Sequence, residues 1–171
     1  LAGAQGAKLK VGFMLPYKPL HHLLMKRLQG VIVLTSANMT DDPQVTGNDE
    51  ARTALKGLAD GFLMHDRDIA QRVDDSVLRL TPIGSIILRR ARGLAPEPLV
   101  LHESFASKPG VLAMGADLKG AVAMAKQGRV TVSQHLGDLA TTRARAAYGE
   151  TVRLMQQLMH SEPAAVVIDL H

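Results

Sequence analysis

Three hydrogen-bonding side chains stand together early in the chain, in the segment Thr35-Ser36-Ala37-Asn38. They come directly after Val31-Ile32-Val33-Leu34, an unbroken apolar run rich in β-branched residues. Such a run is typical of a strand buried on both faces in the middle of a largely parallel sheet. Ligands of open α/β sheets bind just beyond the carboxyl ends of the strands, so Ser36 and Asn38 are candidates for contacting a small molecule. The alternative is that these side chains only form a turn and cap the next segment of the chain.

Two basic features further along the chain could bind phosphate. The strand expected at residues 85–92 ends in the cluster Arg89, Arg90 and Arg92, and guanidinium groups bind phosphate with paired hydrogen bonds. The loop of residues 115–120 lies in the first hairpin of the second half and carries Lys119. Solvated surface charge remains the alternative for the arginine cluster.

The elements that would position these residues can be placed by their apolar spacing. Residues 19–29 have helical spacing, with Pro19 suited to the first turn and Gly30 ending the helix. A second helix is expected to begin at Asn48 as its N-cap, to bury a stripe reaching Ala59 and to end at Gly61. Strands are expected at residues 11–15, 62–64, 77–80 and 85–92.

The pattern changes after residue 98, which divides the chain into a first domain (1–98), a linker (99–109) and a second domain (110–171). The second domain contains three short strands at residues 111–114, 120–125 and 129–133. A long helix and a strand at residues 164–169 come next; one face of the helix is expected to carry Ala144, Tyr148, Thr151, Val152, Met155, Leu158 and Met159. This order is that of the opening of an RNase H-like layer, as in actin-like ATPases, where the first hairpin wraps phosphate. We therefore expect an α/β protein: a twisted sheet with helices, then a three-strand meander, a helix and a strand.

Composition narrows the class of protein further. With 171 residues, 46% hydrophobic and 21% charged, the chain is globular, and its net charge of +4 favours anionic partners only weakly. It has no cysteine, which fits a cytoplasmic setting, and no apolar run long enough to span a membrane. P-loop, dinucleotide-binding, zincin and hydrolase-elbow motifs are absent from the sequence.

Longer blocks of sequence resemble one family. MLPYKPLHHLL, VLTSANMTDDP, ADGFLMHDRDIAQRVDDSVLR and ILRRARGLAPEPL resemble the YrdC-like domain of the hydrogenase maturation carbamoyltransferases, the HypF family. LAMGADLKGAVAMAKQGRVTVSQHLGDL and VVIDLH resemble the start of the next domain of that family, which is similar to the TsaD-type threonylcarbamoyl-transfer proteins. The resemblance covers nearly the whole chain, with the blocks in the same order.

This resemblance implies an ATP-dependent reaction with magnesium. Carbamate derived from carbamoyl phosphate would be activated with ATP to carbamoyl adenylate, and the carbamoyl group passed to the C-terminal cysteine of the partner protein HypE. The resemblance also implies that Ser36, Asn38, Ser76, Arg89 and Lys119 bind the nucleotide, whereas it identifies no catalytic residue. The family pattern GADLKNT reads GADLKGA here, so two polar side chains are missing from the first hairpin.

Two other functions remain open from the sequence. One is a threonylcarbamoyl-adenylate synthase for tRNA modification; the other is a module that binds double-stranded RNA. The resemblance further implies that zinc or iron binds after the VVIDLH strand, so no metal ligand is expected within this chain. We expect the chain to be part of a longer protein and, taken alone, to be inactive and of low stability, because uncovered sheet faces and edges are unfavourable.

Overall fold

The computed structural model describes residues 11–40 and 42–170, so residues 1–10, which belong to the predicted first domain, lie outside the described part. The chain forms two compact units, residues 1–35 and residues 36–171, which we describe separately. No helix of the described residues is long and apolar enough to cross a membrane.

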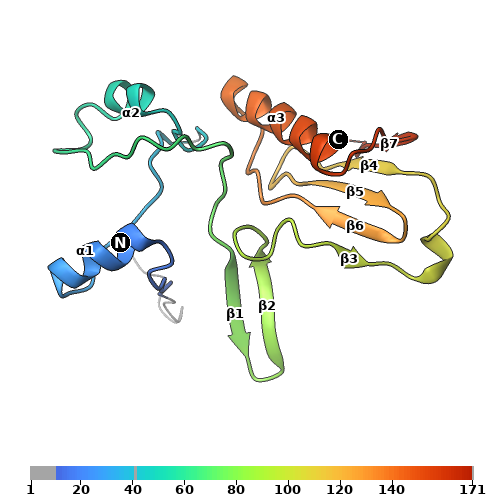
Figure 1. The fold of residues 1–171 in the computed structure, drawn as a ribbon, viewed down its shortest axis with the longest axis horizontal. Helices are drawn as coiled ribbons and strands as arrows, with labels where there is room; N and C mark the ends of the chain where they lie inside the picture. Colours follow the sequence, from blue (N-terminus) through green and yellow to red (C-terminus); the bar gives the residue numbers. More distant parts are fainter. Residues whose placement is uncertain (1–10, 41, 171) are drawn as a thin grey trace, which may run out of the picture. The chain divides into compact units, whose positions relative to one another are not determined.

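The described residues of the first unit form one helix, α1 (Pro19–Leu28), in blue in Figure 1. Pro19 occupies the start of the helix, where its missing N–H is not needed, as the sequence predicts. The helix ends at Gln29, which takes the left-handed conformation (φ 50°) and donates its N–H to the Met25 carbonyl at 3.0 Å. The predicted helix is confirmed, but Gln29 and not Gly30 ends it.

The strand predicted at Val31-Ile32-Val33-Leu34 does not form. The segment has no strand hydrogen bonding, and Val31 and Val33 are 96% and 101% exposed. Residues 11–15 are likewise not a strand. A strand is stabilised by hydrogen bonds to a neighbouring strand, and no described segment pairs with either run. The apolar pattern predicts a strand at each place, but the pattern does not include the neighbouring strand that pairing requires.

The second unit begins with loops around a short helix, α2 (Asn48–Ala54). Gly47 and not Asn48 is the N-cap, and the side-chain amide of Asn48 donates to the His65 carbonyl at 2.7 Å. The helix is shorter than predicted: Gly57, at φ +88°, lies in a turn that a helix cannot continue through. Residues 62–64 form no strand, contrary to the prediction.

A hairpin comes next, built from β1 (Val77–Thr81) and β2 (Gly84–Arg89). The two strands are antiparallel and pair from Val77 with Arg89 to Thr81 with Gly84, so both predicted strands are confirmed, although the second ends at Arg89. Most of the hairpin side chains are exposed, including Leu80 at 84%. The hairpin is therefore held mainly by its backbone ladder.

The remaining strands make one five-stranded sheet. They are β3 (Leu99–Val100), β4 (Val111–Met114), β5 (Val122–Lys126), β6 (Arg129–Val132) and β7 (Ala165–Val167), in the order β3-β6-β5-β4-β7. All neighbours are antiparallel except β4 and β7, which are parallel. The predicted meander, helix and strand are confirmed. The segment predicted as a linker starts inside the sheet, because β3 pairs with β6, and then contains a short 3₁₀ helix, η1 (Glu103–Phe105).

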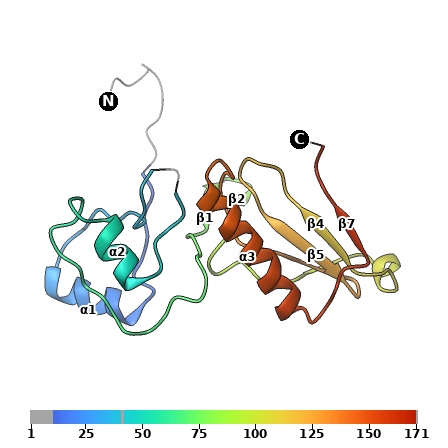
Figure 2. The same cartoon turned by 90° about the horizontal axis from the view of Figure 1, so that it is seen from above.

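Helix α3 (Thr142–Leu158) covers one face of this sheet (Figure 1, Figure 2). The Thr141 hydroxyl caps it by accepting the Ala144 N–H at 3.1 Å. The core beneath the helix consists of the buried side chains Leu112, Val122, Met124, Tyr148 and Met155. The predicted buried face is confirmed except at Leu158, which is 60% exposed. The α/β class expected from the sequence is thus confirmed.

Candidate ligand-binding cleft

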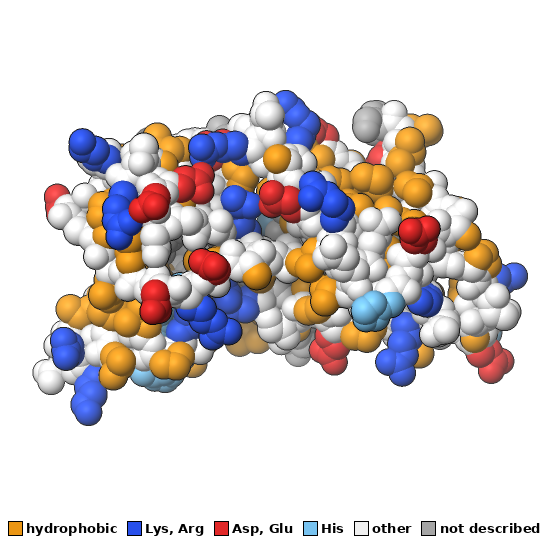
Figure 3. All heavy atoms as spheres, turned by 45° about the horizontal axis from the view of Figure 1, so that its top comes forward, with side chains coloured by type: hydrophobic (Ala, Val, Ile, Leu, Met, Phe, Trp, Pro, Cys, Tyr) orange, Lys and Arg blue, Asp and Glu red, His pale blue; other side chains and the backbone are white. Residues whose placement is uncertain are grey.

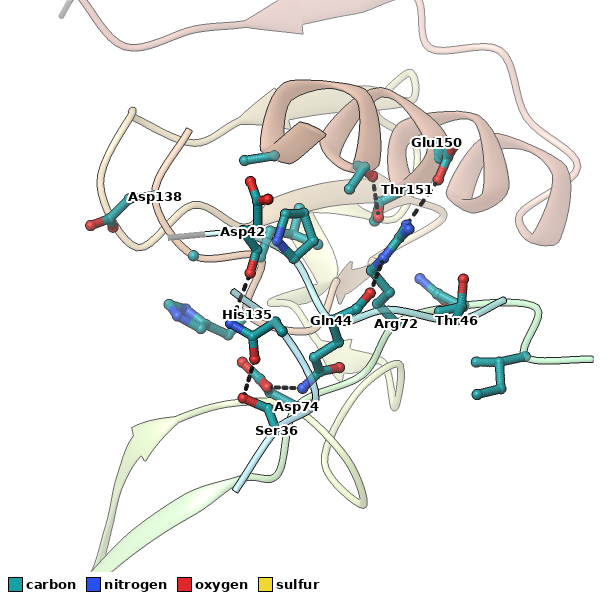
Figure 4. Close-up of a pocket in the computed structure, with 18 of the residues that line it drawn as sticks. Ser36, Asp42, Gln44, Thr46, Arg72, Asp74, His135, Asp138, Glu150 and Thr151 are labelled. Atoms are coloured by element: carbon teal, nitrogen blue, oxygen red, sulfur yellow. Dashed lines mark hydrogen bonds and ion pairs between the residues drawn. The ribbon is translucent and has the colours of Figure 1, made fainter. Parts of the chain in front are cut away.

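A cavity of about 880 Å³ opens within the second unit (Figure 4). One wall comes from the loops of residues 36–46 and 69–74, and the other from residues 135–140 and helix α3. Three of the predicted site residues line it: Ser36, Asn38 and Lys119. The structure therefore brings together side chains that the sequence assigns to different domains.

The Ser36–Asn38 turn is held by its own hydrogen bonds. The Ser36 hydroxyl donates to Asn38 Oδ1, and Asn38 Nδ2 donates to the carbonyls of Met39 (2.8 Å) and Asp42 (3.0 Å). Ser36 is exposed, and its oxygen can still accept a hydrogen bond. The turn is stabilised by its own hydrogen bonds and also lines the cavity. The structural interpretation and the ligand-binding interpretation, which the sequence leaves open, are therefore compatible.

Arg72 joins the loop wall to the other side of the cleft. Its Nε donates to the Gln44 carbonyl at 2.7 Å, and its Nη1 lies 3.4 Å from Glu150 Oε2 on α3. Its own carbonyl accepts from Gln134 Nε2 at 3.2 Å. Gln44 in turn donates its amide to Asp74, so these side chains form a connected polar network along the wall (Figure 4).

The opposite wall is the loop that comes after β6. Its backbone is bonded to neighbouring segments: the N–H of His135 donates to the Arg90 carbonyl, and that of Leu136 to the Gly120 carbonyl, each at 2.8 Å. Asp138 accepts the backbone N–H of Lys119 at 2.7 Å. These bonds fix where the His135 side chain stands in the cleft. Burial and the charge of Arg89 lower the pKa of His135 from its ordinary value and so favour the neutral imidazole.

A second, smaller cavity of about 320 Å³ shares part of this wall. Lys119 and His135 line both cavities, and Arg89 and Arg90 line the smaller one. Arg89 also lies 3.8 Å from Asp74. The basic end of β2 and the first hairpin of the sheet, which are separate phosphate candidates in the sequence, therefore meet at one place.

Ser76 lines neither cavity. Its hydroxyl donates to the Arg92 carbonyl and accepts the Ala91 N–H, both at 2.9 Å, so both bonds serve the local backbone. Its assignment to the nucleotide stays a prediction.

The loop that carries Lys119 is built around small residues. A Cβ on Gly115 would lie 2.4 Å from the Ala121 carbonyl oxygen, and one on Gly120 would lie 3.2 Å from that of Gly137. Glycine at position 120, where the family pattern has Asn, lets the loop approach residue 137 closely. Lys119 itself takes a left-handed conformation, with φ 52°.

The sequence did not single out several residues that line the cleft: Gln44, Arg72, Asp74, His135 and Asp138. A signal for His135 was present, because Ser133-Gln134-His135 is a polar set directly after an apolar run, like the segment around Ser36. Within residues 11–40 and 42–170, no group of three or more His, Asp or Glu side chains is arranged to hold a metal ion.

Comparisons with known proteins divide the chain in two. Residues 3–91 match the family model Sua5/YciO/YrdC, described as telomere recombination, and residues 106–171 match the HypF Kae1-like domain. The chain is 45% identical over 162 residues to carbamoyltransferase HypF of Rhodobacter capsulatus, covering 95% of this chain and 22% of that protein. It is 33% identical over 162 residues to the probable carbamoyltransferase HypF of Methanocaldococcus jannaschii, covering 94% and 21%.

The chain is also similar to two solved structures of HypF proteins. The chain is similar to the crystal structure of full-length HypF in the phosphate- and nucleotide-bound form, with a TM-score of 0.87 and 39% identity, over 92% of this chain and 25% of that one. A crystal structure of T. kodakarensis HypF matches with a TM-score of 0.73 and 33% identity, over 80% and 18%. The chain spans 21–23% of the length of the curated relatives it matches.

Proposed function

The chain belongs to the HypF family, joining its Sua5/YciO/YrdC part to its Kae1-like part, and on this premise we propose that it serves an ATP-dependent carbamoyl transfer. The observation that carries the proposal is the cleft itself. Its walls come from residues 36–74 and residues 119–154, which fall in the two different family matches. A group activated at one wall and consumed at the other would not need to leave the protein.

In this proposal the first wall binds the nucleotide. ATP, with magnesium, activates carbamate derived from carbamoyl phosphate, forming carbamoyl adenylate and releasing pyrophosphate. Adenylation gives the carbamoyl carbon a good leaving group, and the reaction requires neutralisation of phosphate charge and shielding from water. Ser36 and Asn38 would contact the nucleotide, while Arg89 and Lys119 would neutralise phosphate charge.

In the second step, the thiol of the C-terminal cysteine of HypE attacks the carbamoyl carbon, the thiol proton passes to a base, and AMP leaves with the bonding electrons. The product is a thiocarbamate, an intermediate in hydrogenase maturation. The described residues offer no metal-binding cluster, so the zinc or iron expected for the family does not fit them, and no step is assigned to it.

The alternatives have less support. A threonylcarbamoyl-adenylate synthase would share the first family match but not the HypF Kae1-like match at residues 106–171. For a module that binds double-stranded RNA, a continuous basic surface would be expected. On the face drawn in Figure 3, acidic side chains lie among the basic ones.

The proposal is tested in a chimera. This chain replaces the matching segment of the Rhodobacter capsulatus relative, and carbamoyl transfer to HypE is measured with labelled carbamoyl phosphate and ATP. The chimera is expected to carbamoylate HypE. Its failure to do so, despite correct folding and retained hydrolysis of carbamoyl phosphate, would overturn the proposed function.

Nucleotide binding is tested in the same chimera. Asn38→Ala should weaken ATP binding about tenfold, since a lost hydrogen bond that leaves a buried partner unpaired costs ~1–3 kcal/mol and ~1.4 kcal/mol is one decade. Ser36→Ala should have the same or a slightly smaller effect. Ser107→Ala, an exposed serine outside both cavities, is the control and should change nothing. If ATP affinity stays within about twofold in both variants, the turn is only structural.

A further inference from the structure

Ion pairs connect helix α3 to the loops that form the other wall of the large cleft. Arg143 Nη1, on α3, lies 3.1 Å from Glu50 Oε1 on α2 and 3.9 Å from Asp42 Oδ2. Further along the helix, Glu150 Oε2 lies 3.4 Å from Arg72 Nη1 (Figure 4). Each pair joins a residue of the Sua5/YciO/YrdC match to a residue of the HypF Kae1-like match.

Arg143 and Glu150 lie on one side of α3. Seven residues are close to two full turns, so the two side chains project in nearly the same direction, about 10 Å apart along the axis. The helix supplies the cation to one contact and the anion to the other. A shift of the loops along the helix that brought Arg72 to Arg143 would place like charges together, which is unfavourable. The charge pattern therefore specifies one position of the loops against the helix.

The loops are not part of the apolar core beneath α3. In the described part of the chain, the members of that core come from the sheet, from the loop after β6 and from α3 with its C-terminal end. The side chains of the ion pairs are between 27% and 60% exposed. Exposed ion pairs stabilise a contact only weakly and are screened by salt. This contact between the two walls should therefore form and separate easily.

The base of the cleft is joined by better shielded groups. The Gln134 amide donates to the Arg72 carbonyl at 3.2 Å, and the backbone N–H of His135 donates to the Arg90 carbonyl at 2.8 Å. Gln134 is 7% exposed and Ala91, which comes after Arg90, is 0% exposed. Because water competes less for these groups than for the ion pairs, the walls should separate first at the ion pairs while the base stays joined.

We propose that Arg143 and Glu150 form an electrostatic latch with Glu50, Asp42 and Arg72: the paired state holds the cleft closed, and separation of the pairs opens it. The proposal rests on the proposed function only for its use in the reaction. The closed cleft keeps water away from carbamoyl adenylate, and the open cleft admits the thiol of the partner protein. The latch residues act through the position of the loops, so they are positioning residues.

The latch is tested by a distance measurement in the whole chain. The sequence has no cysteine, so Thr53→Cys on α2 and Gln157→Cys on α3, both exposed and outside both cavities, carry the only spin labels. At low salt we expect mainly one short distance. At about 1 M salt, where charges are screened within ~3 Å, a longer distance should gain population. Arg143→Gln should raise the ratio of open to closed molecules about fivefold at low salt.

A matched control uses another arginine of the same helix. Arg153→Gln removes the same charge at an exposed position outside both cavities and should leave the distances unchanged. Glu50→Gln added to Arg143→Gln should open the cleft no further, because the pair is already lost. Circular dichroism shows whether each variant keeps the fold. The salt titration of the labelled parent chain needs no change at the latch, so it tests the proposal even where a variant unfolds.

Two results would overturn the latch. One is a distance that does not change with salt or in Arg143→Gln and Glu150→Gln. The other is an equal change in the control Arg153→Gln, since the effect would then come from the charge of the helix as a whole.

The use of the latch is tested in the chimera, as the ratio of AMP released to HypE cysteine carbamoylated. Carbamoyl adenylate that meets water gives carbamate and AMP without transfer, so Arg143→Gln should raise this ratio by up to about fivefold, and Arg153→Gln should not. An unchanged ratio in Arg143→Gln would overturn the shielding role. Failure of the unsubstituted chimera to carbamoylate HypE would count against the proposed function and leave the distance results standing, so the two proposals fail separately.

Discussion

The β1–β2 hairpin and the five-stranded sheet are both formed from residues that the sequence marks as strands, yet they differ in what holds them. In the sheet, Val122 and Met124 are 0% and 1% exposed beneath α3. In the hairpin, Leu80 and Ile83 are 84% and 94% exposed. The backbone ladders are alike, so the difference lies in whether side chains are removed from water. Pairing can define a strand, but burial is what should give it stability.

The largest expected effect on stability comes from truncating a side chain in the core of the sheet, and the matched truncation is made in the hairpin. Met124→Ala should lower the free energy of unfolding by about 2–5 kcal/mol, because it removes buried apolar volume and leaves a cavity. Leu80→Ala should change it by less than about 0.5 kcal/mol, as is usual for exposed positions. Urea unfolding followed by circular dichroism measures both. Equal losses would mean that the hairpin face is covered in solution.

Two serine substitutions compare the sheet with the hairpin region through polar side chains instead of apolar ones. Ser133 Oγ accepts the Val122 N–H at 2.9 Å and donates to the Gln134 carbonyl at 2.8 Å, and Ser133 is only 2% exposed. Ser133→Ala should therefore cost about 1–3 kcal/mol, since the Val122 N–H is left buried without a partner.

Ser76 makes an equivalent pair of backbone bonds beside the hairpin but is less buried. Ser76→Ala should cost less than about 1 kcal/mol, because water can replace the hydroxyl. The same unfolding measurement applies to both serine variants. A loss for Ser76→Ala as large as that for Ser133→Ala would show that the region beside the hairpin is as well shielded from water as the sheet.

The dependence of folding stability on alkaline pH should come from the core of the sheet and not from the rest of the chain. Burial raises the pKa of Tyr148 above its ordinary value of 10.0. The folded state therefore favours the protonated phenol: its stability is fully present below the pKa of the unfolded chain and is lost as the pH rises through the folded value. Tyr148→Phe should flatten the alkaline fall in melting temperature. Tyr17→Phe, in the other unit, is the control, and an equal effect there would contradict the assignment.

The smallest effect is expected at the ion pair between the loops and α3. Glu150→Gln removes the partner that lies 3.4 Å from Arg72, where the two side chains are 60% and 32% exposed. The variant should lose at most about 1 kcal/mol of stability, and the loss should disappear in high salt. A larger loss that persists in salt would mean that the Arg72 network, and not only apolar burial, holds the cleft wall.

The strands and the helix of the second half could be predicted because the signals for each element lie within that element or beside it in the sequence. Strands β4, β5 and β6 are consecutive in the chain and pair with one another, and α3 carries its own cap and apolar face. The prediction of a strand at residues 31–34 was wrong, since strand formation depends on a pairing partner about which the apolar pattern says nothing.

The site residues also fall into those that the sequence could identify and those that it could not. The polar turn at Ser36 and Asn38 was visible because it comes directly after an apolar run. His135 and Arg72 could not be assigned to the cleft, because only the tertiary fold brings residues 72 and 135 to its walls. That Arg89 and Lys119 line the same cavity could not be predicted either, since the two residues lie far apart in the sequence.

The parallel pairing of β7 with β4 has a consequence for the order of folding. Hairpins β4–β5 and β5–β6 join residues close in the chain, whereas β5, β6 and α3 all lie between the paired residues Val111 and Ala165. Long-range contacts close slowly because loop entropy must be lost first. During synthesis, the meander can assemble as soon as it leaves the ribosome. The outer edge of β4 stays unpaired until β7 has also left the ribosome. Until then that edge presents unpaired backbone groups to other chains.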